Sequence, residues 1–258
     1  MKKRNRFGIF TLVLILSLCG CTQDKIPISS SSDVQKEQDT LPEAEITPEE
    51  EPFLYGYQNL NEEEKTRYRQ ILAGIENYED SVTVEACSEE EINKVSNLVF
   101  VDHPEIFWLE QQNYSFNQKE NSDVDLLELN LVYNMGKDEI EDTKQQIEAK
   151  AEEWSQELSN CENEYDKIKY VYEFLGKNVL YDSESENNQN IQSVFLNQST
   201  VCMGFAKATQ YLLIRNGIFC TLVTGKVMPE NMEHAWNLVR IGENYYYVDT
   251  TWSSSGFV

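Results

Sequence analysis

The sequence predicts an α+β fold, in which helices and antiparallel strands are segregated along the chain. Two segments have apolar residues at helical spacing and acidic residues in their first turns: LNEEEKTRYRQILAGIENYE and SEEEINKVSNLVF. Other segments have the alternation or the turn chemistry of strands: LLELNLVYN, and the pair HAWNLVRI and YYYVDTTW on either side of GEN. Forty per cent hydrophobic residues is enough to bury a core.

Residues 53–135 are predicted to form a small α+β module. The apolar positions of its first helix are Tyr68, Ile71, Leu72 and Ile75. Its second helix opens with a capping-box pattern, Ser88 to Glu91. We expect strands at IFWLEQQNYSF and LLELNLVYN, because alternate residues of the latter are apolar: Leu127, Leu129, Leu131 and Tyr133.

His103 lies in DHPEIFW, between Asp102 and Glu105. A metal or catalytic role is one interpretation of this cluster. Pro104, however, indicates a turn between a helix and a strand, because a proline disfavours helix at the residue before it. We therefore favour turn and capping work by Asp102.

The first 20 residues have the pattern of a signal peptide. MKKRNR is basic, FGIFTLVLILSL is an apolar run too short to span a bilayer, and LCGC follows it. This ending resembles the lipobox of bacterial lipoproteins, which implies cleavage before Cys21, lipidation of its thiol and an extracytoplasmic, membrane-anchored protein. An ordinary secretory signal or a short membrane anchor is the alternative interpretation.

Residues 21–52 are predicted to be a disordered tether. They are rich in Ser, Glu, Asp, Thr, Gln and Pro, and they have too few large apolar residues to offset the entropy of ordering. Such a segment would hold the folded part away from the bilayer.

The net charge of −24 makes nucleic acid an improbable partner, since an acidic surface repels phosphates. No Gly-rich phosphate loop is present, so we expect no cofactor. Two histidines and the lack of paired C-x-x-C motifs indicate no metal site. Besides the candidate nucleophile described below, Cys87, Cys161 and Cys220 remain, and the sequence leaves their disulfide state open.

Residues 136–258 are predicted to form the second unit. Its first part is helical from about Lys137 to Lys177, with a break at SNCENE. The run STVCMGFAKATQYLLIRNGI then predicts a helix that Ser199 or Thr200 caps and that Asn216-Gly217 ends. Cys202 would lie in its first turn, where unpaired N–H groups and the helix dipole favour a thiolate. A small buried hydrophobic side chain is the alternative for this cysteine.

His234 and Asp249 lie on the two predicted strands of a hairpin. If Gly242-Glu243 is a two-residue turn, facing residues have numbers that sum to 485, and His234 faces Thr251. Asp249 is then a diagonal neighbour of His234 on the same face. A thiol, an imidazole and a carboxylate in contact would be able to act as nucleophile, base and orienting group.

Two stretches, VCMGFAKATQYLLIRNGIFCTLVTG and HAWNLVRIGENYYYVDTTW, resemble the transglutaminase-like core of bacterial exported proteins. The resemblance covers about residues 160–252. It implies a papain-like triad of Cys202, His234 and Asp249, on a helix packed against an antiparallel sheet. YGYQNL and DHPEIFW also look like the segment that precedes such cores in lipoproteins of this type.

Three features depart from the family pattern. Phe205 stands where tyrosine is frequent, and Ser253 and Ser254 follow Trp252 where acidic residues are common. Family members usually continue beyond the position of Val258, which predicts a truncated chain. For the oxyanion, we expect the Cys202 N–H and, as a second donor, the side-chain amide of Gln189 or Gln192. Trp236 and Trp252 are expected to pack the core around the hairpin, with a role in lining the substrate site as the alternative.

These features predict an exported, membrane-anchored cysteine enzyme that acts on amide bonds of a protein or peptide through a thioester. Water as acceptor would make it a peptidase or amidase, and an amine would make it a cross-linking enzyme; a cell-wall peptide is one candidate substrate. The alternative is a non-catalytic binding module of the cell envelope that retains the triad. The sequence does not predict an oligomeric state.

Overall fold

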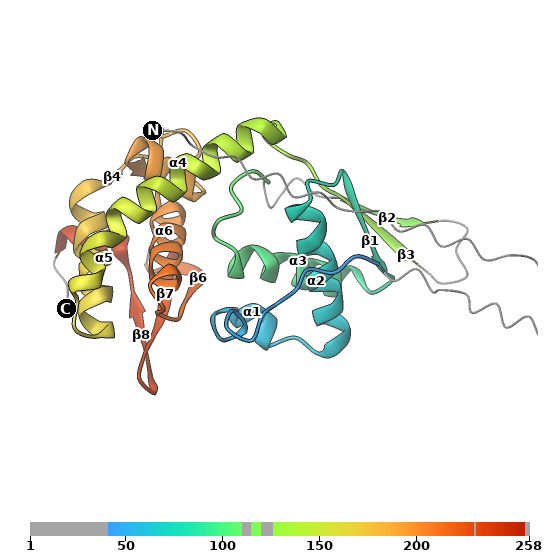
Figure 1. Cartoon of the computed structure of the whole chain (residues 1–258), viewed down its shortest axis with the longest axis horizontal. Helices are drawn as coiled ribbons and strands as arrows, with labels where there is room; N and C mark the ends of the chain where they lie inside the picture. Colours follow the sequence, from blue (N-terminus) through green and yellow to red (C-terminus); the bar gives the residue numbers. More distant parts are fainter. Residues whose placement is uncertain (1–40, 110–114, 120–125, 230, 256–258) are drawn as a thin grey trace, which may run out of the picture. The chain divides into compact units, whose positions relative to one another are not determined.

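The computed structural model describes residues 41–109, 115–119, 126–229 and 231–255, all within one compact unit, Thr40–Val258. The predicted α+β fold is confirmed: helices pack on separate antiparallel sheets (Figure 1). The predicted signal peptide, the predicted lipidation site Cys21 and residues 21–40 of the predicted tether lie outside the described residues. No helix in the described ranges has the length and apolar character needed to cross a membrane.

The N-terminal part of this unit consists of helices on one antiparallel sheet. The helices are η1 (Glu51–Phe53), α1 (Tyr55–Gln58), α2 (Glu62–Glu76) and α3 (Glu89–Asp102). The sheet has the order β1-β3-β2, from β1 (Ser81–Glu85), β2 (Ser115–Lys119) and β3 (Leu126–Asn130). Strand β1 was not predicted from the sequence, since SVTVE is short and has only two large apolar residues. In the structure Val82 and Val84 are buried, because β1 lies between α2 and β3.

The predicted disordered tether, residues 21–52, is wrong for residues 41–52, which are ordered in the structure. The N–H of Ala44 donates to the carbonyl of Arg69 on α2 at 2.9 Å, and the Arg69 guanidinium bonds the Glu43 carboxylate at 2.7 Å. Thr47 and Glu50 close a turn by mutual hydrogen bonds. A polar composition did not prevent order here, because α2 supplies the bonding partners.

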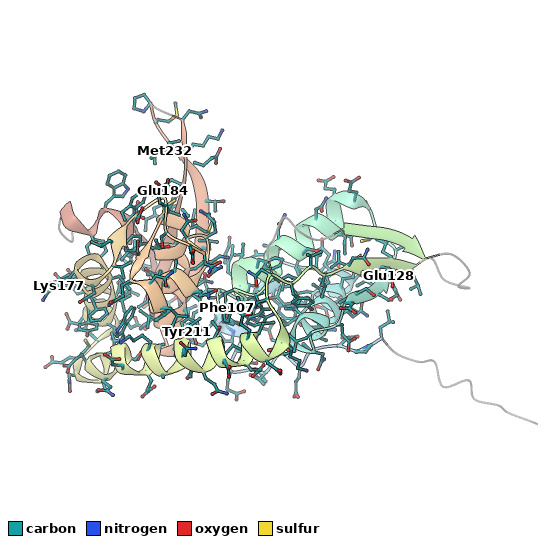
Figure 2. All side chains as sticks on the ribbon, turned by 90° about the horizontal axis from the view of Figure 1, so that it is seen from above. Phe107, Glu128, Lys177, Glu184, Tyr211 and Met232 are labelled. Carbon is teal, nitrogen blue, oxygen red and sulfur yellow. The ribbon has the colours of Figure 1, made fainter. Side chains whose placement is uncertain are left out.

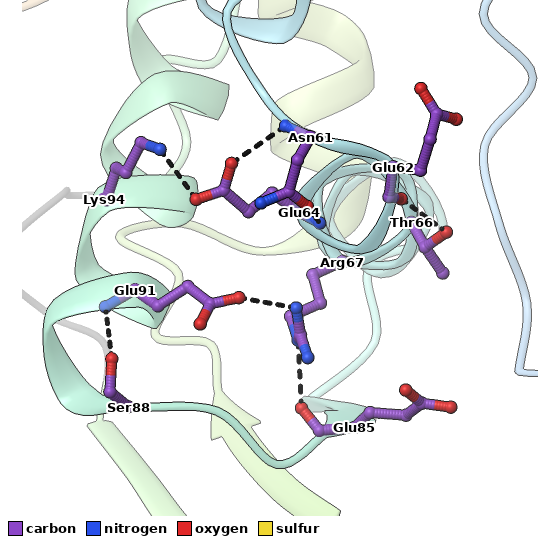
Figure 3. A network of polar contacts seen from close by, with 9 residues as sticks. All are labelled: Asn61, Glu62, Glu64, Thr66, Arg67, Glu85, Ser88, Glu91 and Lys94. Atoms are coloured by element: carbon purple, nitrogen blue, oxygen red, sulfur yellow. Dashed lines mark hydrogen bonds and ion pairs between the residues drawn. The ribbon is translucent and has the colours of Figure 1, made fainter.

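The N-termini of α2 and α3 are capped, and the caps connect the two helices (Figure 3). Asn61 and Glu64 form a complete capping box on α2. On α3 only half of the predicted box is present: Ser88 accepts from the N–H of Glu91 at 3.1 Å. The Glu91 carboxylate instead bonds Arg67 of α2 at 2.6 Å. Tertiary contact thus redirects a side chain that local sequence assigns to the cap.

Asp102, the last residue of α3, has the capping role that the sequence favoured. Its carboxylate accepts from the N–H groups of Gly56 and Tyr57 at 2.8 Å each, and from the Tyr68 hydroxyl at 3.0 Å. It therefore satisfies the start of α1 and joins α1, α2 and α3. Burial raises the pKa of Asp102, and the three donors oppose that shift.

The predicted strand at 106–116 is only partly present. Ile106, Phe107 and Trp108 form a buried turn after α3, and Leu109 makes one antiparallel bridge to Tyr133. Regular pairing is present from Ser115, where β2 begins. The aromatic run resembles a strand because of its composition, but its side chains are used to fill the core.

The C-terminal part places a central helix, α6, between other helices and a second sheet (Figure 1). Its helices are α4 (Lys137–Ser155), η2 (Gln156–Asn160), α5 (Glu164–Asn178), a turn of π-helix, η3 (Ser193–Asn197), α6 (Cys202–Arg215) and η4 (Thr250–Ser255). Its strands are β4 (Leu180–Tyr181), β5 (Ser199–Thr200), β6 (Cys220–Val227), β7 (Met232–Ile241) and β8 (Asn244–Val248). The predicted break in SNCENE is confirmed, as is the end of α6 before Asn216-Gly217, where Gly217 has φ +76°.

The second sheet has the order β6-β7-β8, and its hairpin has the predicted register. Asn237 faces Val248 and Ile241 faces Asn244, so facing numbers sum to 485 as expected for a turn at Gly242-Glu243. Pairing ends at Val248, however, and η4 starts at Thr250. Asp249 is therefore in the connection between β8 and η4 rather than within a strand.

Lys207 is a buried cation on α6, and its burial lowers its pKa to about 8, although the charge of Glu105 opposes this shift. The folded chain thus binds fewer protons at Lys207 than the unfolded chain between pH of about 8 and 10.5, and the cost of burying the charge is fully present below that window. We expect Lys207→Met to raise the free energy of unfolding at pH 7 by about 1–3 kcal/mol. Urea denaturation at pH 7 and at about pH 10.5 measures this, and the gain should shrink at the higher pH.

Lys177 provides the matched control, since it is exposed at the end of α5 (Figure 2). Lys177→Met should change the free energy of unfolding by less than about 0.5 kcal/mol at either pH. Equal gains from the two substitutions, or a Lys207→Met gain that grows with pH, would contradict the expected cost of burial.

Candidate active site

Cys202 is the first residue of α6, and its side chain is partly exposed. The N-cap residue is Val201, which has no side-chain acceptor. The first N–H groups of α6 are therefore left without a side-chain cap, and they lie at the positive end of the helix dipole. Such a helix start can stabilise a thiolate or the oxyanion of an acyl intermediate.

The predicted capping of α6 by Ser199 or Thr200 is wrong. Both residues are in β5, which pairs in parallel with β4. The Thr200 hydroxyl turns inward, donates to the carbonyl of Asn188 at 2.9 Å and bonds Ser193 at 2.7 Å. The strand pairing fixes the direction of this side chain, which does not cap α6.

Gly204 allows the segment before α6 to approach its first turn. A Cβ atom at this position would lie 1.9 Å from Thr200 Oγ1 and 3.0 Å from the Asn188 carbonyl. Both atoms are already held by hydrogen bonds, so they cannot move away cheaply. The C-x-G spacing in the sequence was the available signal for this glycine, and its role was not predicted.

His234 and Asp249 are in contact, which the predicted hairpin register permits. Nε2 of His234 lies 2.7 Å from Oδ2 of Asp249, and the imidazole is almost fully buried. The second carboxylate oxygen accepts from the N–H of Thr251 at 3.2 Å, which fixes the rotamer of Asp249. Helix α6, which carries Cys202, packs directly against β7, which carries His234.

The contact with Asp249 assigns the tautomer of His234. A carboxylate at 2.7 Å from Nε2 requires a proton on that nitrogen, because two lone pairs would otherwise face each other. The indole N–H of Trp252, 3.3 Å from the same nitrogen, is then a van der Waals neighbour and not a donor in the neutral state. Nδ1 is left as the basic nitrogen of the ring.

Two tryptophans flank the His234 ring. Trp236 stacks on it with the ring centres 5.8 Å apart, and Trp252 lies against it at 6.0 Å. Trp236 needs Gly225, which faces His234 across the sheet, since a Cβ there would lie 2.7 Å from the indole. Contrary to expectation, Trp252 is half exposed, so it covers the histidine and does not pack the core.

Two tyrosines lie near the other members of the set. Partial burial raises the pKa of Tyr181 on β4, and the electrostatic interaction with the neighbouring Cys202 raises it further. Burial likewise raises the pKa of Tyr172 on α5, and Asp249 adds to that effect. Tyr181 and its neighbour Leu180 are largely exposed, so the cysteine is bordered by apolar surface on its β4 side.

The structure gives neither predicted oxyanion amide a hydrogen bond to Cys202 or His234. Gln189 is exposed and bonds Asn188 at 2.8 Å. Gln192 is partly buried, and its Oε1 has no hydrogen-bond partner among the described residues. The role of both in binding an oxyanion remains a prediction. Gly204, Gly225 and Tyr181 were not predicted as site residues, because only tertiary packing brings them there.

The other cysteines and the other histidine lie apart from this set. Cys87, Cys161 and Cys220 are free thiols, and burial raises the pKa of each. His103 forms an ion pair with Glu105 at 2.8 Å. It borders a cavity of about 370 Å³ next to Tyr211 and Ile214, near the opposite end of α6 from Cys202. No triad residue lines that cavity, so we place the chemistry at the start of α6.

The segment that holds this residue set resembles a transglutaminase-like core. Residues 152–250 match the model of the transglutaminase-like superfamily, and this segment includes Cys202, His234 and Asp249. The predicted family resemblance is therefore confirmed for this part of the chain. The match does not extend to the N-terminus, so the resemblance of residues 1–21 to a lipoprotein signal stays a prediction.

Three known proteins are similar to parts of this chain. The kyphoscoliosis peptidase of Mus musculus is 22% identical over 112 residues, which is 38% of this chain and 17% of that protein. A crystal structure of a TGase aligns at a TM-score of 0.39 with 18% identity, over 56% of this chain and 44% of that one. The periplasmic domain of TgpA from Pseudomonas aeruginosa aligns at 0.33 with 12% identity, over 68% and 69%. The aligned region spans about a sixth of the length of the mouse peptidase.

Proposed function

We propose that this chain is a transglutaminase-like cysteine enzyme that acts on amide bonds of proteins or peptides through a thioester. The observation that carries the proposal is the 2.7 Å contact between His234 on β7 and Asp249 in the β8–η4 connection. The Cys202 helix, α6, packs against both β7 and η4. A buried imidazole with one nitrogen held by a carboxylate is the arrangement that a base next to a nucleophile requires.

The site supports acyl transfer in two steps. In the first, Sγ of Cys202 attacks the amide carbonyl, and Nδ1 of His234 takes the thiol proton. The tetrahedral oxyanion lies at the uncapped N–H groups of α6. His234 then returns the proton to the leaving nitrogen, so that an amine departs and a thioester remains.

In the second step an acceptor attacks the thioester carbon. His234 removes a proton from water or from a primary amine, and the thiol of Cys202 leaves and recovers that proton. Water yields a carboxylic acid, and an amine yields a new amide. Asp249 stays ionised throughout and stabilises the imidazolium that forms between the transfers.

The proposed setting is the outer face of a bacterial membrane. It is supported by the sequence of residues 1–21 alone, in which an apolar run ends at LCGC. Lipidation at Cys21 would keep the enzyme at the membrane surface and confine it to substrates of the cell envelope.

A glutamine peptide tests the reaction. The full-length chain is incubated with the peptide alone and with an added primary amine, and the products are weighed by mass spectrometry. We expect conversion of glutamine to glutamate in water, to an amide of the added amine, or to both, with an acyl adduct trapped on Cys202 at early times. The Cys202→Ala variant should give neither product.

The two classes of function give different results. If wild-type protein converts neither glutamine peptides nor peptide bonds of envelope proteins, and no acyl adduct forms on Cys202, the enzyme proposal is overturned. The chain would then be a binding module of the cell envelope that retains the triad residues.

A further inference from the structure

Two buried polar side chains connect α6 to the segments that carry His234 and Asp249. Asn237, on β7 three residues after His234, donates from Nδ2 to the carbonyl of Ala206 at 2.9 Å. Thr250, directly after Asp249, bonds Thr209 on α6 with 2.5 Å between the two Oγ1 atoms. All four residues are at most 2% exposed.

The direction of the threonine bond follows from the donor count. The Thr209 hydroxyl has one proton and donates it to the carbonyl of Phe205 at 2.8 Å. Thr250 is therefore the donor to Thr209. The resulting chain runs from the residue after Asp249, through Thr209, to a carbonyl one helical turn beyond Cys202.

The two connections end on adjacent carbonyls, those of Phe205 and Ala206. The Asn237 bond sets the distance between β7 and the first turns of α6. The Thr250–Thr209 bond sets the distance between the β8–η4 connection and the same part of α6. Asp249 needs such a support, because β8 pairing stops at Val248 and no strand partner holds residue 249. The hydrogen bonds that Asp249 receives from the next residues are local: the Thr251 N–H donates to its carboxylate at 3.2 Å, and the Trp252 N–H donates to its carbonyl at 3.3 Å.

We infer that Thr250 and Asn237 are positioning residues, which hold Asp249 and His234 in register with Cys202 through α6. The inference rests on the proposed function, since it describes how that triad is aligned. Neither residue contacts the reacting atoms. Because a misplacement of about 1 Å can cost about a hundredfold in rate, loss of either bond should be visible in the reactivity of Cys202.

The experiment measures alkylation of Cys202 by iodoacetamide in the full-length chain. Mass spectrometry of the Cys202 peptide separates this thiol from Cys87, Cys161 and Cys220. Rates are compared at pH 7 and at about pH 10, where free thiols ionise without help from a base. The first variant is Thr250→Val, which removes the hydroxyl but preserves the side-chain shape.

We expect Thr250→Val to lower the rate about tenfold at pH 7 and by less than about twofold at pH 10. Thr250→Ser retains a hydroxyl at this position, so its Cys202 alkylation rate should stay within about twofold of wild type at both pH values. Asn237→Leu, which breaks the other connection, should reproduce the loss at pH 7 and tests the inference even where Thr250→Val folds poorly.

Thr221 supplies a matched control. It is a buried threonine on β6, in the sheet that carries His234 and Asn237, and its Oγ1 has no hydrogen-bond partner among the described residues. Thr221→Val should therefore leave both rates unchanged. The inference is overturned if Thr250→Val and Asn237→Leu both react like wild type at pH 7. It is also overturned if both lose reactivity equally at the two pH values, which indicates access or folding alone.

Failure of this inference is distinguishable from failure of the proposed function. In one outcome the wild-type protein converts no amide, but the variants lose Cys202 alkylation at pH 7 as expected. The inference on Thr250 and Asn237 then holds, and the proposed enzyme function fails. In the opposite outcome the wild-type protein converts glutamine peptides, but Cys202 of the variants is alkylated at the normal rate. The proposed function then holds, and contacts other than those of Thr250 and Asn237 align the triad.

Discussion

Replacing His234 by alanine is expected to lower the conversion of a glutamine peptide by about 10⁴-fold or more. The substitution removes the base that takes the Cys202 proton and the acid that protonates the leaving nitrogen. It also leaves the Asp249 carboxylate without the imidazole that it contacts at 2.7 Å. Product formation is followed by mass spectrometry at neutral pH, and the Cys202→Ala variant gives the background rate without catalysis.

The chain contains one other histidine, which makes a matched control. His103 is bonded to Glu105 and lies at the turn after α3, away from the triad. His103→Gln should retain activity within about threefold once the rate is divided by the folded fraction. A His234→Ala variant that keeps more than about one hundredth of wild-type activity would remove His234 from the mechanism.

Asp102→Ala is expected to reduce the free energy of unfolding by about 3–5 kcal/mol. The carboxylate is 2% exposed and accepts from Gly56, Tyr57 and Tyr68. Its removal leaves two backbone N–H groups and one hydroxyl buried without partners, and it disconnects α1 from α3. Urea denaturation followed by circular dichroism measures the change.

Asp102→Asn distinguishes the contribution of the hydrogen bonds from the contribution of side-chain packing. Its amide has nearly the same shape but one acceptor oxygen, so it should lose about half as much stability as alanine. Glu91→Gln is a second comparison, since it weakens a charged contact with Arg67 that is partly exposed; it should cost less than about 1 kcal/mol. Asp102→Ala that costs no more than Glu91→Gln would contradict the central role of Asp102.

The hairpin shows why part of the site was predictable. Its register depends on a two-residue turn at Gly242-Glu243 and on strict alternation, and both can be read from neighbouring residues. His234 and Asp249 were therefore predicted to be within reach of each other, and they are. The helix around Cys202 was predictable for the same reason, because its apolar spacing and the Asn216-Gly217 stop are local.

Other features depend on contacts between distant residues. Thr200 has the residue type of a helix cap, but β4–β5 pairing turns its hydroxyl toward Asn188 and Ser193. Glu91 has the position of a capping-box acid, but Arg67 attracts it. Residues 41–52 have a polar composition, but α2 orders them. In the first two cases a local capping preference worth about 1 kcal/mol is overcome by a partner that sequence spacing does not show.

The sequence by itself determined the α+β class, the hairpin register and the identity of the three candidate residues, since these follow from periodicity, turn chemistry and a family resemblance. Only the tertiary structure decided which nitrogen of His234 faces Asp249, that Trp252 covers the imidazole, and that Thr250 and Asn237 bond to α6. The physical reason is range: periodicity acts over a few residues, whereas a donor and its acceptor here are up to 41 residues apart.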